Sequence, residues 1–179
     1  RLGVEAYLAG EQRTEVKHEY LDGQIVAMGD ASRAHGLLAL SLSALLLPHA
    51  RRKGCQLFTA DMKVRIDHDS GSWFYYPDLV LACDPTDREP MYVRRPGLLV
   101  EVLSPSTEHI DTREKLLAAQ ESGIKLILAS GRPAWGLRAL AQELDLQNHD
   151  GLLVAFNGAH VVDAQTDEVL DNPDPRGAA

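Results

Sequence analysis

The sequence predicts an α/β fold in which a mixed β-sheet is flanked by helices. Residues 79–83 and 98–103 are nearly unbroken apolar runs, which is typical of central strands covered on both faces. Apolar residues recur at helical spacing over residues 33–47, which predicts a helix packed on that sheet. The chain has 179 residues, of which 45% are hydrophobic, so it can build one ordinary globular core.

The N-terminal part predicts helices and short strands before the first apolar run. Asp22-Gly23 is a preferred pair for a tight primed turn and predicts a hairpin over residues 18–28. Ser32 is suited to cap the helix over 33–47, and Pro48 predicts its end or a kink. The remaining expected elements are a helix over 4–8 and strands over 55–58, 62–66 and 73–76, with a turn over 67–71.

After the second apolar run, helical and strand patterns alternate, so the C-terminal segment also has α/β character. Gly123 predicts the end of a helix over 111–122, and Asn157-Gly158 predicts a turn between two strands. The expected elements are a strand over 124–129, a helix over 137–144, strands over 152–156 and 160–164, and a flexible tail over 171–179.

Composition restricts the classes of function. A formal net charge of −8 argues against a protein that coats nucleic acid by bulk electrostatics, but not against a nuclease with a local acidic site. No run approaches the roughly twenty apolar residues of a membrane helix, so no membrane partner is expected. Cys55 and Cys83 lie in apolar surroundings and are interpreted as small core residues in a reducing, cytoplasmic compartment.

Two acidic residues point to a metal site. Glu101 lies inside an apolar strand, where an ionised carboxylate costs several kcal/mol unless a cation compensates it. Asp78 opens the other apolar run, so neighbouring strands would bring both carboxylates to one Mg²⁺ or Mn²⁺, with the Val102 carbonyl as a third ligand. A salt bridge from Glu101 to Arg94, Arg95 or Lys115 explains the same spacing equally well.

Several motifs in order resemble the Uma-type restriction endonucleases, a branch of the PD-(D/E)xK nuclease superfamily. The resemblance covers about residues 4–115 of this chain. The motifs are Glu5-Ala6-Tyr7-Leu8, His18-Glu19-Tyr20-Leu21-Asp22-Gly23, Ala31-Ser32 with His35, Asp61-Met62-Lys63-Val64, Tyr75-Tyr76-Pro77-Asp78 and Leu99-Val100-Glu101-Val102-Leu103-Ser104-Pro105-Ser106-Thr107. The resemblance implies a restriction-endonuclease-like mixed sheet and a magnesium-dependent nuclease.

The resemblance also implies roles for individual residues. Asp78 and Glu101 match the paired metal ligands, and Glu19 matches an acidic residue that can complete the site. The superfamily's usual lysine would fall at Leu103, and Lys115 matches the lysine that this family is read as supplying from the following helix.

Two further positions bear on the same resemblance. The family's aromatic residue four positions after that lysine is replaced by Ala119. His35 matches a frequent family position, where a structural role near the helix start is as compatible as catalysis.

From about residue 112 the chain resembles instead a fragment of the Cof-type phosphatases of the haloacid dehalogenase superfamily. The similarity is carried by residues 116–133, by Phe156-Asn157-Gly158-Ala159 and by Val161-Val162-Asp163-Ala164. It implies a phosphate-binding hydroxyl at Ser130 with Arg132 close by. The nucleophilic Asp motif, the later lysine and the acidic magnesium motif of those phosphatases are absent from the sequence, so phosphatase activity is the least favoured hypothesis.

The expected organisation is a nuclease-like domain over 1–115, a helix-strand segment over 116–170 that completes its core, and the tail over 171–179. The leading hypothesis is an endonuclease that hydrolyses DNA with Mg²⁺ or Mn²⁺, using Glu19, Asp78, Glu101 and Lys115; a homodimer is compatible with it. The alternative is a non-catalytic nucleic-acid-binding or scaffold protein on the same fold, which the displaced lysine and Ala119 would explain.

Overall fold

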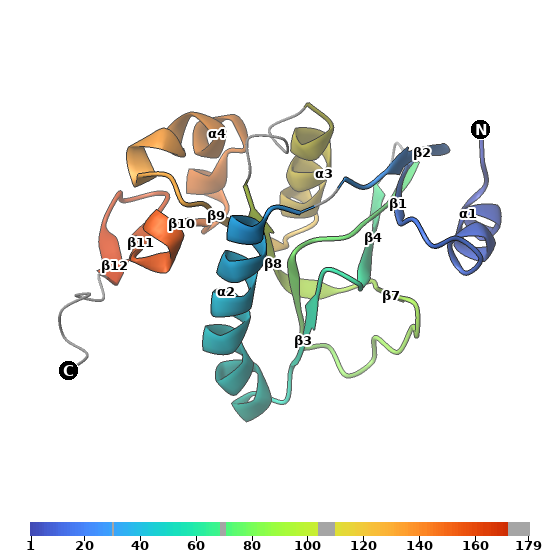
Figure 1. Ribbon diagram of the computed structural model, residues 1–179, viewed down its shortest axis with the longest axis horizontal. Helices are drawn as coiled ribbons and strands as arrows, with labels where there is room; N and C mark the ends of the chain where they lie inside the picture. Colours follow the sequence, from blue (N-terminus) through green and yellow to red (C-terminus); the bar gives the residue numbers. More distant parts are fainter. Residues whose placement is uncertain (30, 69–70, 104–109, 172–179) are drawn as a thin grey trace.

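The computed structural model describes residues 1–29, 31–68, 71–103 and 110–171, with the backbone alone for residues 68, 110–114 and 171. Two β-sheets and four α-helices make up this part of the chain (Figure 1). The Ser104-Pro105-Ser106-Thr107 motif and the tail from residue 172 lie outside the described residues. The α/β class with mixed sheets and flanking helices is confirmed, although the strands are divided between two sheets.

The larger sheet has seven strands and contains both apolar runs. Its three central strands are parallel to one another, and the strands on both sides of them are antiparallel. In spatial order the strands are β12 (Val169–Asp171), β11 (His160–Asp163), β10 (Leu152–Ala155), β9 (Lys125–Ala129), β8 (Pro96–Val102), β6 (Leu79–Ala82) and β3 (Gln56–Thr59). The segment beyond residue 115 therefore adds strands to the sheet that holds Glu101.

The smaller sheet has five strands and is built largely from the two N-terminal hairpins. Asp22 and Gly23 both have positive φ, 44° and 96°, as the primed turn of the first hairpin requires. In spatial order the strands are β2 (Gln24–Ala27), β1 (His18–Leu21), β5 (Gly71–Tyr75), β4 (Lys63–His68) and β7 (Tyr92–Val93).

Helices cover both faces of the seven-stranded sheet. On one face, α2 (Arg33–Arg52) buries Leu38 and Leu42 against β6, β8, β9 and β10. On the other face, α3 (Ile110–Glu121) and α4 (Arg138–Glu143) share a core with the same sheet and with β4 and β5 of the smaller sheet. The fourth helix, α1 (Val4–Glu11), packs Tyr7 against an aromatic cluster of the smaller sheet.

Of the two alternatives at Pro48, the structure shows continuation rather than an end, because α2 runs through Pro48 to Arg52. Ser32 caps its start as predicted, since the Ser32 hydroxyl accepts the backbone N–H of His35 at 3.2 Å. Ala50, which is buried beyond the proline, anchors the last turn, so packing outweighs the one backbone hydrogen bond that Pro48 cannot donate.

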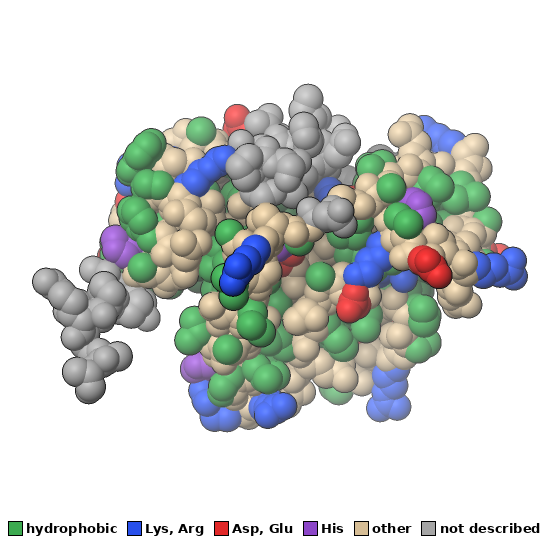
Figure 2. Space-filling view, in the orientation of Figure 1, with side chains coloured by type: hydrophobic (Ala, Val, Ile, Leu, Met, Phe, Trp, Pro, Cys, Tyr) green, Lys and Arg blue, Asp and Glu red, His purple; other side chains and the backbone are tan. Residues whose placement is uncertain are grey.

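The opposite face of α2 is exposed and apolar. Leu37, Leu40 and Leu45 are each more than half exposed, and Figure 2 shows hydrophobic side chains along this helix with basic side chains at its C-terminal end. Within the described part of the chain, no helix is both long and apolar enough to cross a membrane.

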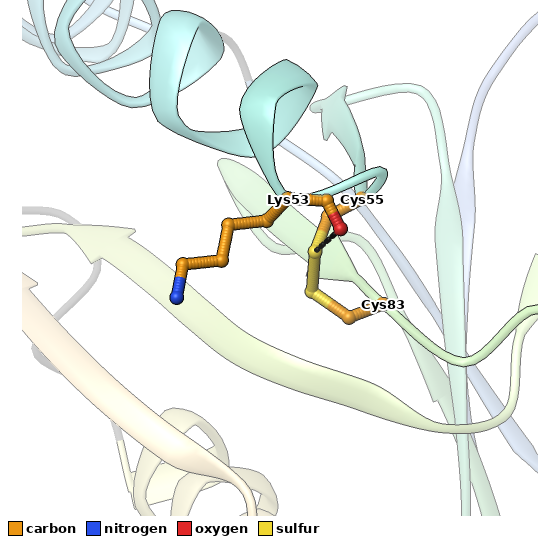
Figure 3. Close-up of a disulfide and its surroundings, with 3 residues drawn as sticks. All are labelled: Lys53, Cys55 and Cys83. Atoms are coloured by element: carbon orange, nitrogen blue, oxygen red, sulfur yellow. Dashed lines mark hydrogen bonds between the residues drawn. A yellow bond between two sulfur atoms is a disulfide. The ribbon is translucent and has the colours of Figure 1, made fainter.

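The interpretation of Cys55 and Cys83 as two separate core thiols is wrong, because they form a disulfide (Figure 3). The register of β3 with β6 pairs Gln56 with Ala82, which brings the two flanking cysteines face to face with a Cα–Cα distance of 4.3 Å. Cys83 is exposed rather than buried. The pairing was not visible in the sequence, since it depends on a strand register, and it removes the argument for a reducing compartment.

Candidate active site

Asp78 and Glu101 are brought together by the pairing of β6 with β8. In this antiparallel pair Leu79 lies opposite Val100. Asp78, the residue before Leu79, therefore lies opposite Glu101, the residue after Val100. Residues opposed in this way have Cβ atoms about 5 Å apart and project from the same face of the sheet. The neighbouring-strand condition on which the predicted metal pair depended is therefore met.

Asp78 is held on both of its carboxylate oxygens. Oδ1 lies 2.5 Å from Nε2 of His35 in the first turn of α2, and Oδ2 accepts the backbone N–H of Val102 at 2.8 Å. The side chains of Asp78 and His35 are 14% and 13% exposed. These contacts fix the orientation of the carboxylate at the end of β8.

Glu19 and Lys115 enter the same region from β1 and α3. Lys115 Nζ lies 2.5 Å from Oε2 of Glu19, and both side chains are more than four-fifths buried. Tyr75, fully buried on β5, donates its hydroxyl to the backbone carbonyl of Lys115 at 3.4 Å, and the Lys115 ammonium lies 6.0 Å from the centre of its ring. The contact links the smaller sheet to α3.

The group carries an excess of negative charge. Glu19, Asp78 and Glu101 contribute three carboxylates against the single ammonium of Lys115, which would leave −2 if all three were ionised and His35 were neutral. Burial and the nearby charges of Asp78 and Glu19 raise the pKa of Glu101 well above its ordinary value, although Lys115 opposes the shift. The folded protein therefore favours a proton or a cation at Glu101.

Burial, Glu101 and Glu19 likewise raise the pKa of Tyr75 well above its ordinary value. Tyr75 therefore remains a neutral hydrogen-bond donor beside the carboxylates, and this role was missed from the sequence. The motif Tyr75-Tyr76-Pro77-Asp78 carried a usable signal, because a polar aromatic residue stands three positions before the acid. His35 was noted, but its contact with Asp78 depends on how α2 packs on β6.

The oxygen donors at this site suit a magnesium-type ion. Two carboxylates, those of Asp78 and Glu101, are available to it. Among the residues that the structure describes, no set of three or more His, Cys, Asp and Glu side chains is placed to hold a metal. Asp78 and Glu101 provide two hard oxygen donors, and Mg²⁺ in proteins is commonly bound by one or two carboxylates together with water and substrate phosphates. Glu19 is instead engaged with Lys115.

The structure also shows where the remaining residues considered in the sequence analysis lie relative to this site. Arg94 and Arg95 precede β8 at its opposite end, which leaves Lys115 as the basic residue beside Glu101 among those considered as partners. Leu103 and Ala119 are both buried in the core around α3, where neither can act on a substrate.

Ser130 and Arg132 follow the last residue of β9, beside the C-terminal end of β8. Ser130 is 2% exposed, and its hydroxyl accepts the backbone N–H of Arg132 at 3.2 Å. The hydroxyl thus stabilises the local turn.

A mixed sheet covered by helices, with Asp78 and Glu101 opposed near the C-terminal end of β8 and Lys115 on the next helix, is the arrangement expected of a restriction-endonuclease-like α/β protein. The chain belongs to the Uma2 family, described as "Putative restriction endonuclease", which matches residues 4–130. A solved structure of a "putative nuclease belonging to DUF820" from Anabaena variabilis shares the fold, with a TM-score of 0.50 and 16% identity over 90% of this chain and 80% of that one.

Relatives match either part of the chain. The Synechocystis protein slr1290 is 41% identical over 112 residues, which is 62% of this chain and 58% of that protein. Residues 103–174 match the haloacid dehalogenase-like hydrolases, and Bacillus subtilis YxeH, described as a "Putative phosphatase", is 37% identical over 34% of this chain and 22% of its own length. The chain thus spans less than two-thirds of slr1290. The two family matches overlap over residues 103–130, which include α3 and β9.

Proposed function

We propose that this chain is an endonuclease that hydrolyses DNA phosphodiester bonds with Mg²⁺ or Mn²⁺. The observation that carries the proposal is the placement of three carboxylates, Glu19, Asp78 and Glu101, around the single ammonium of Lys115. Carboxylates gathered in this way favour a bound cation, because ionisation of Glu101 is otherwise opposed by burial and by its acidic neighbours. Membership of the Uma2 family supports a phosphodiester as the substrate.

Each residue of the site has a distinct role in this proposal. Asp78 and Glu101 would hold the cation, with the Val102 carbonyl as a further oxygen donor, while Glu19 pairs with Lys115 beside them. When bound, the metal polarises the phosphodiester and lowers the pKa of its water. His35 orients Asp78 through the 2.5 Å contact, and the Lys115 ammonium orients the attacking water or stabilises negative charge on the phosphate.

The direct test is cleavage of plasmid and single-stranded DNA with Mg²⁺ or Mn²⁺, followed by EDTA. We expect cleavage that EDTA abolishes and that falls by at least about 100-fold in Asp78→Ala and in Glu101→Ala, as is usual when charge stabilisation is removed. Asp150→Asn is the matched control, because Asp150 is an exposed carboxylate paired with Lys125 away from the site. Absence of cleavage, or cleavage that survives both site substitutions, would refute the proposal.

A second candidate is a nucleic-acid-binding or scaffold protein that keeps the nuclease fold without catalysis. It is favoured by the contacts that already engage Glu19 and Asp78 and by the lack of a three-ligand group among the described residues. This candidate predicts DNA binding that is indifferent to Mg²⁺ and to Glu101→Gln, together with no cleavage of either DNA substrate.

A further inference from the structure

A second charged cleft lies at the other end of β8. Its volume is about 760 Å³, and it is bounded by the end of β4, by the segment that leads into β8 and by the turn between α3 and β9. Four of its lining side chains are the guanidinium groups of Arg65, Arg88, Arg94 and Arg95. Neither the proposed nuclease site nor the family matches assign a role to this cluster.

The cleft is distinct from the carboxylate site. Pro96, the first residue of β8, lines the cleft, whereas Glu101 is five residues further along the same strand. At about 3.3 Å per residue, the two regions are separated by about 17 Å. A ligand of the cleft therefore does not contact Glu101 unless it is at least that long.

Two acidic residues of the cleft, Asp67 and Asp87, form hydrogen bonds with neighbouring groups of their own loops and strands. One oxygen of Asp87 accepts the backbone N–H groups of Arg94 and Arg95 at 2.7 and 2.8 Å, so this carboxylate holds the loop rather than the guanidinium groups. Asp67 accepts Ser72 Oγ at 2.6 Å and Arg65 Nε at 2.9 Å. With Glu89, the lining has four positive and three negative side chains, and Asp84 outside the lining pairs with Arg95 at 3.0 Å, so Arg88 and Arg94 are the guanidinium groups most available to a ligand.

Arg88 and Arg94 are the guanidinium groups placed to receive an anion, since Arg65 and Arg95 form close ion pairs with Asp67 and Asp84. Arg65 lies over the rings of Phe74 and Tyr92, 5.5 and 6.0 Å from their centres, so its orientation is fixed. Arg94 is 48% exposed, and the Glu89 carboxylate is at the limit of ion pairing with it, at 4.0 Å. Arg88 donates to the carbonyl of Pro85 at 3.3 Å and forms no ion pair with another described residue.

Arginine suits one class of ligand in particular. Its planar guanidinium group matches the geometry of phosphate and binds it through two parallel hydrogen bonds. Burial opposes ionisation of Asp67, yet hydrogen bonds from Ser72 and Arg65 and the charges of Arg65 and Arg94 lower its pKa. The positive charges of Arg65 and Arg94 both reach this carboxylate.

We infer that this cleft binds a phosphate ester, which is the backbone of the nucleic-acid substrate away from the cleaved bond. The identity of the substrate rests on the proposed function, whereas the phosphate chemistry rests on the arginine cluster alone. Duplex DNA rises about 3.4 Å per base pair, so a separation of about 17 Å corresponds to about five base-pair steps. This separation is well within the length of a 20-base-pair duplex.

The test measures binding of a fluorescent 20-base-pair DNA by anisotropy in EDTA, so that it is independent of cleavage. The slope of log K against log salt concentration falls in magnitude by about 0.9 for each phosphate that the protein no longer neutralises. We expect a fall of about 2 in Arg88→Gln/Arg94→Gln. Arg138→Gln is the control, because Arg138 is a half-exposed arginine paired with Asp167 outside the cleft, and it should leave the slope unchanged.

A parallel titration with inorganic phosphate, followed by calorimetry, separates the sources of the ligand. If the double substitution weakens DNA binding, the inference holds whether or not the protein cleaves DNA. If it weakens only phosphate binding, the cleft serves a free phosphate compound, and the assignment to the nucleic-acid backbone is overturned. If neither ligand responds, or if Arg138→Gln has the same effect, the whole inference is overturned.

Discussion

At position 101 a carboxylate stands between Val100 and Val102 in the middle layer of the fold, and its surroundings decide its charge. Asp78 across the strand pair and Glu19 from the other sheet repel it, whereas Lys115 attracts it. The residue is thus stable either with a proton or beside a cation. A carboxylate that gains from a nearby cation is suited to the metal-dependent reaction proposed above.

The raised pKa of Glu101 predicts how the stability of the metal-free protein depends on pH. In the unfolded chain a Glu titrates near pH 4.3, so the contribution of the folded-state proton is complete below that pH. It is lost as the pH rises toward the higher folded pKa, at about 1.4 kcal/mol for each pH unit.

In EDTA, Glu101→Gln should therefore be more stable than the wild-type protein at pH 8, by at least about 1.4 kcal/mol, and similar to it at pH 4. Urea unfolding at several pH values measures the difference. A destabilisation by Glu101→Gln that is equal at both pH values would show that the carboxylate is not strained in the folded state.

Lys115 offers a second test at the same scale. Lys115→Met leaves Glu19 and Glu101 without the ammonium beside them, and loss of one partner of a buried pair costs about 3 kcal/mol. We expect thermal unfolding of the metal-free protein at a clearly lower temperature, with partial recovery in Lys115→Met/Glu19→Gln. A loss below about 0.5 kcal/mol would mean that the pair behaves like an exposed one.

At the scale of elements, the disulfide joins the edge strand β3 to β6, the strand that starts directly after Asp78. Closing a chain segment of 28 residues stabilises a protein by about 3.5 kcal/mol in the chain-entropy description. Cys55→Ser/Cys83→Ser should lower the free energy of unfolding by about that amount, as measured in urea. Wild-type protein treated with a thiol reductant should match it, whereas an unchanged midpoint after reduction would contradict the pairing.

The longer helices and strands were predictable from sequence, because each has a recognisable pattern of apolar residues, a turn motif or a capping residue. The hairpin at Asp22-Gly23, the cap at Ser32 and the two apolar runs all depend on local chemistry, and the structure confirms them. The strands β7 and β12 were missed, since two or three residues are too few to show a period. Their formation depends on β4 and β11 as neighbours.

The candidate site was partly predictable from sequence, because Glu101 is a charged residue in an otherwise apolar strand. An acid at position 101 is informative because the surrounding run is otherwise apolar. The contacts of Asp78 with His35 and of Lys115 with Tyr75 depend on packing between elements far apart in the chain. Pairing of Cys55 with Cys83 depends on strand register in the same way.

At the scale of the whole molecule, the two family matches meet in one sheet. β9 lies between β8, from the nuclease-like part, and β10, from the dehalogenase-like part, and it is parallel to both. The proposed division after residue 115 falls inside α3, whose Leu116 and Ala119 are buried in the core shared with β8. We therefore expect the two parts to fold as one unit.

Truncation after Ser122 removes β9 and exposes the edge and one face of β8, which is a recognised aggregation hazard. We expect the fragment of residues 1–122 to be insoluble or to lack a cooperative thermal transition. Removal of the tail from Asn172 should leave the transition unchanged, since terminal segments rich in Pro and Gly tolerate deletion. A soluble 1–122 fragment that melts cooperatively would show that the parts fold independently.

Metal binding by Asp78 and Glu101 is the central claim, and calorimetric titration with Mn²⁺ tests it without reference to catalysis. The wild-type protein and the Asp150→Asn control should show saturable binding. Asp78→Asn and Glu101→Gln should each abolish it, while circular dichroism shows that both variants remain folded. Absence of binding to the wild-type protein, or undiminished binding to both variants, would contradict the assignment of these two carboxylates.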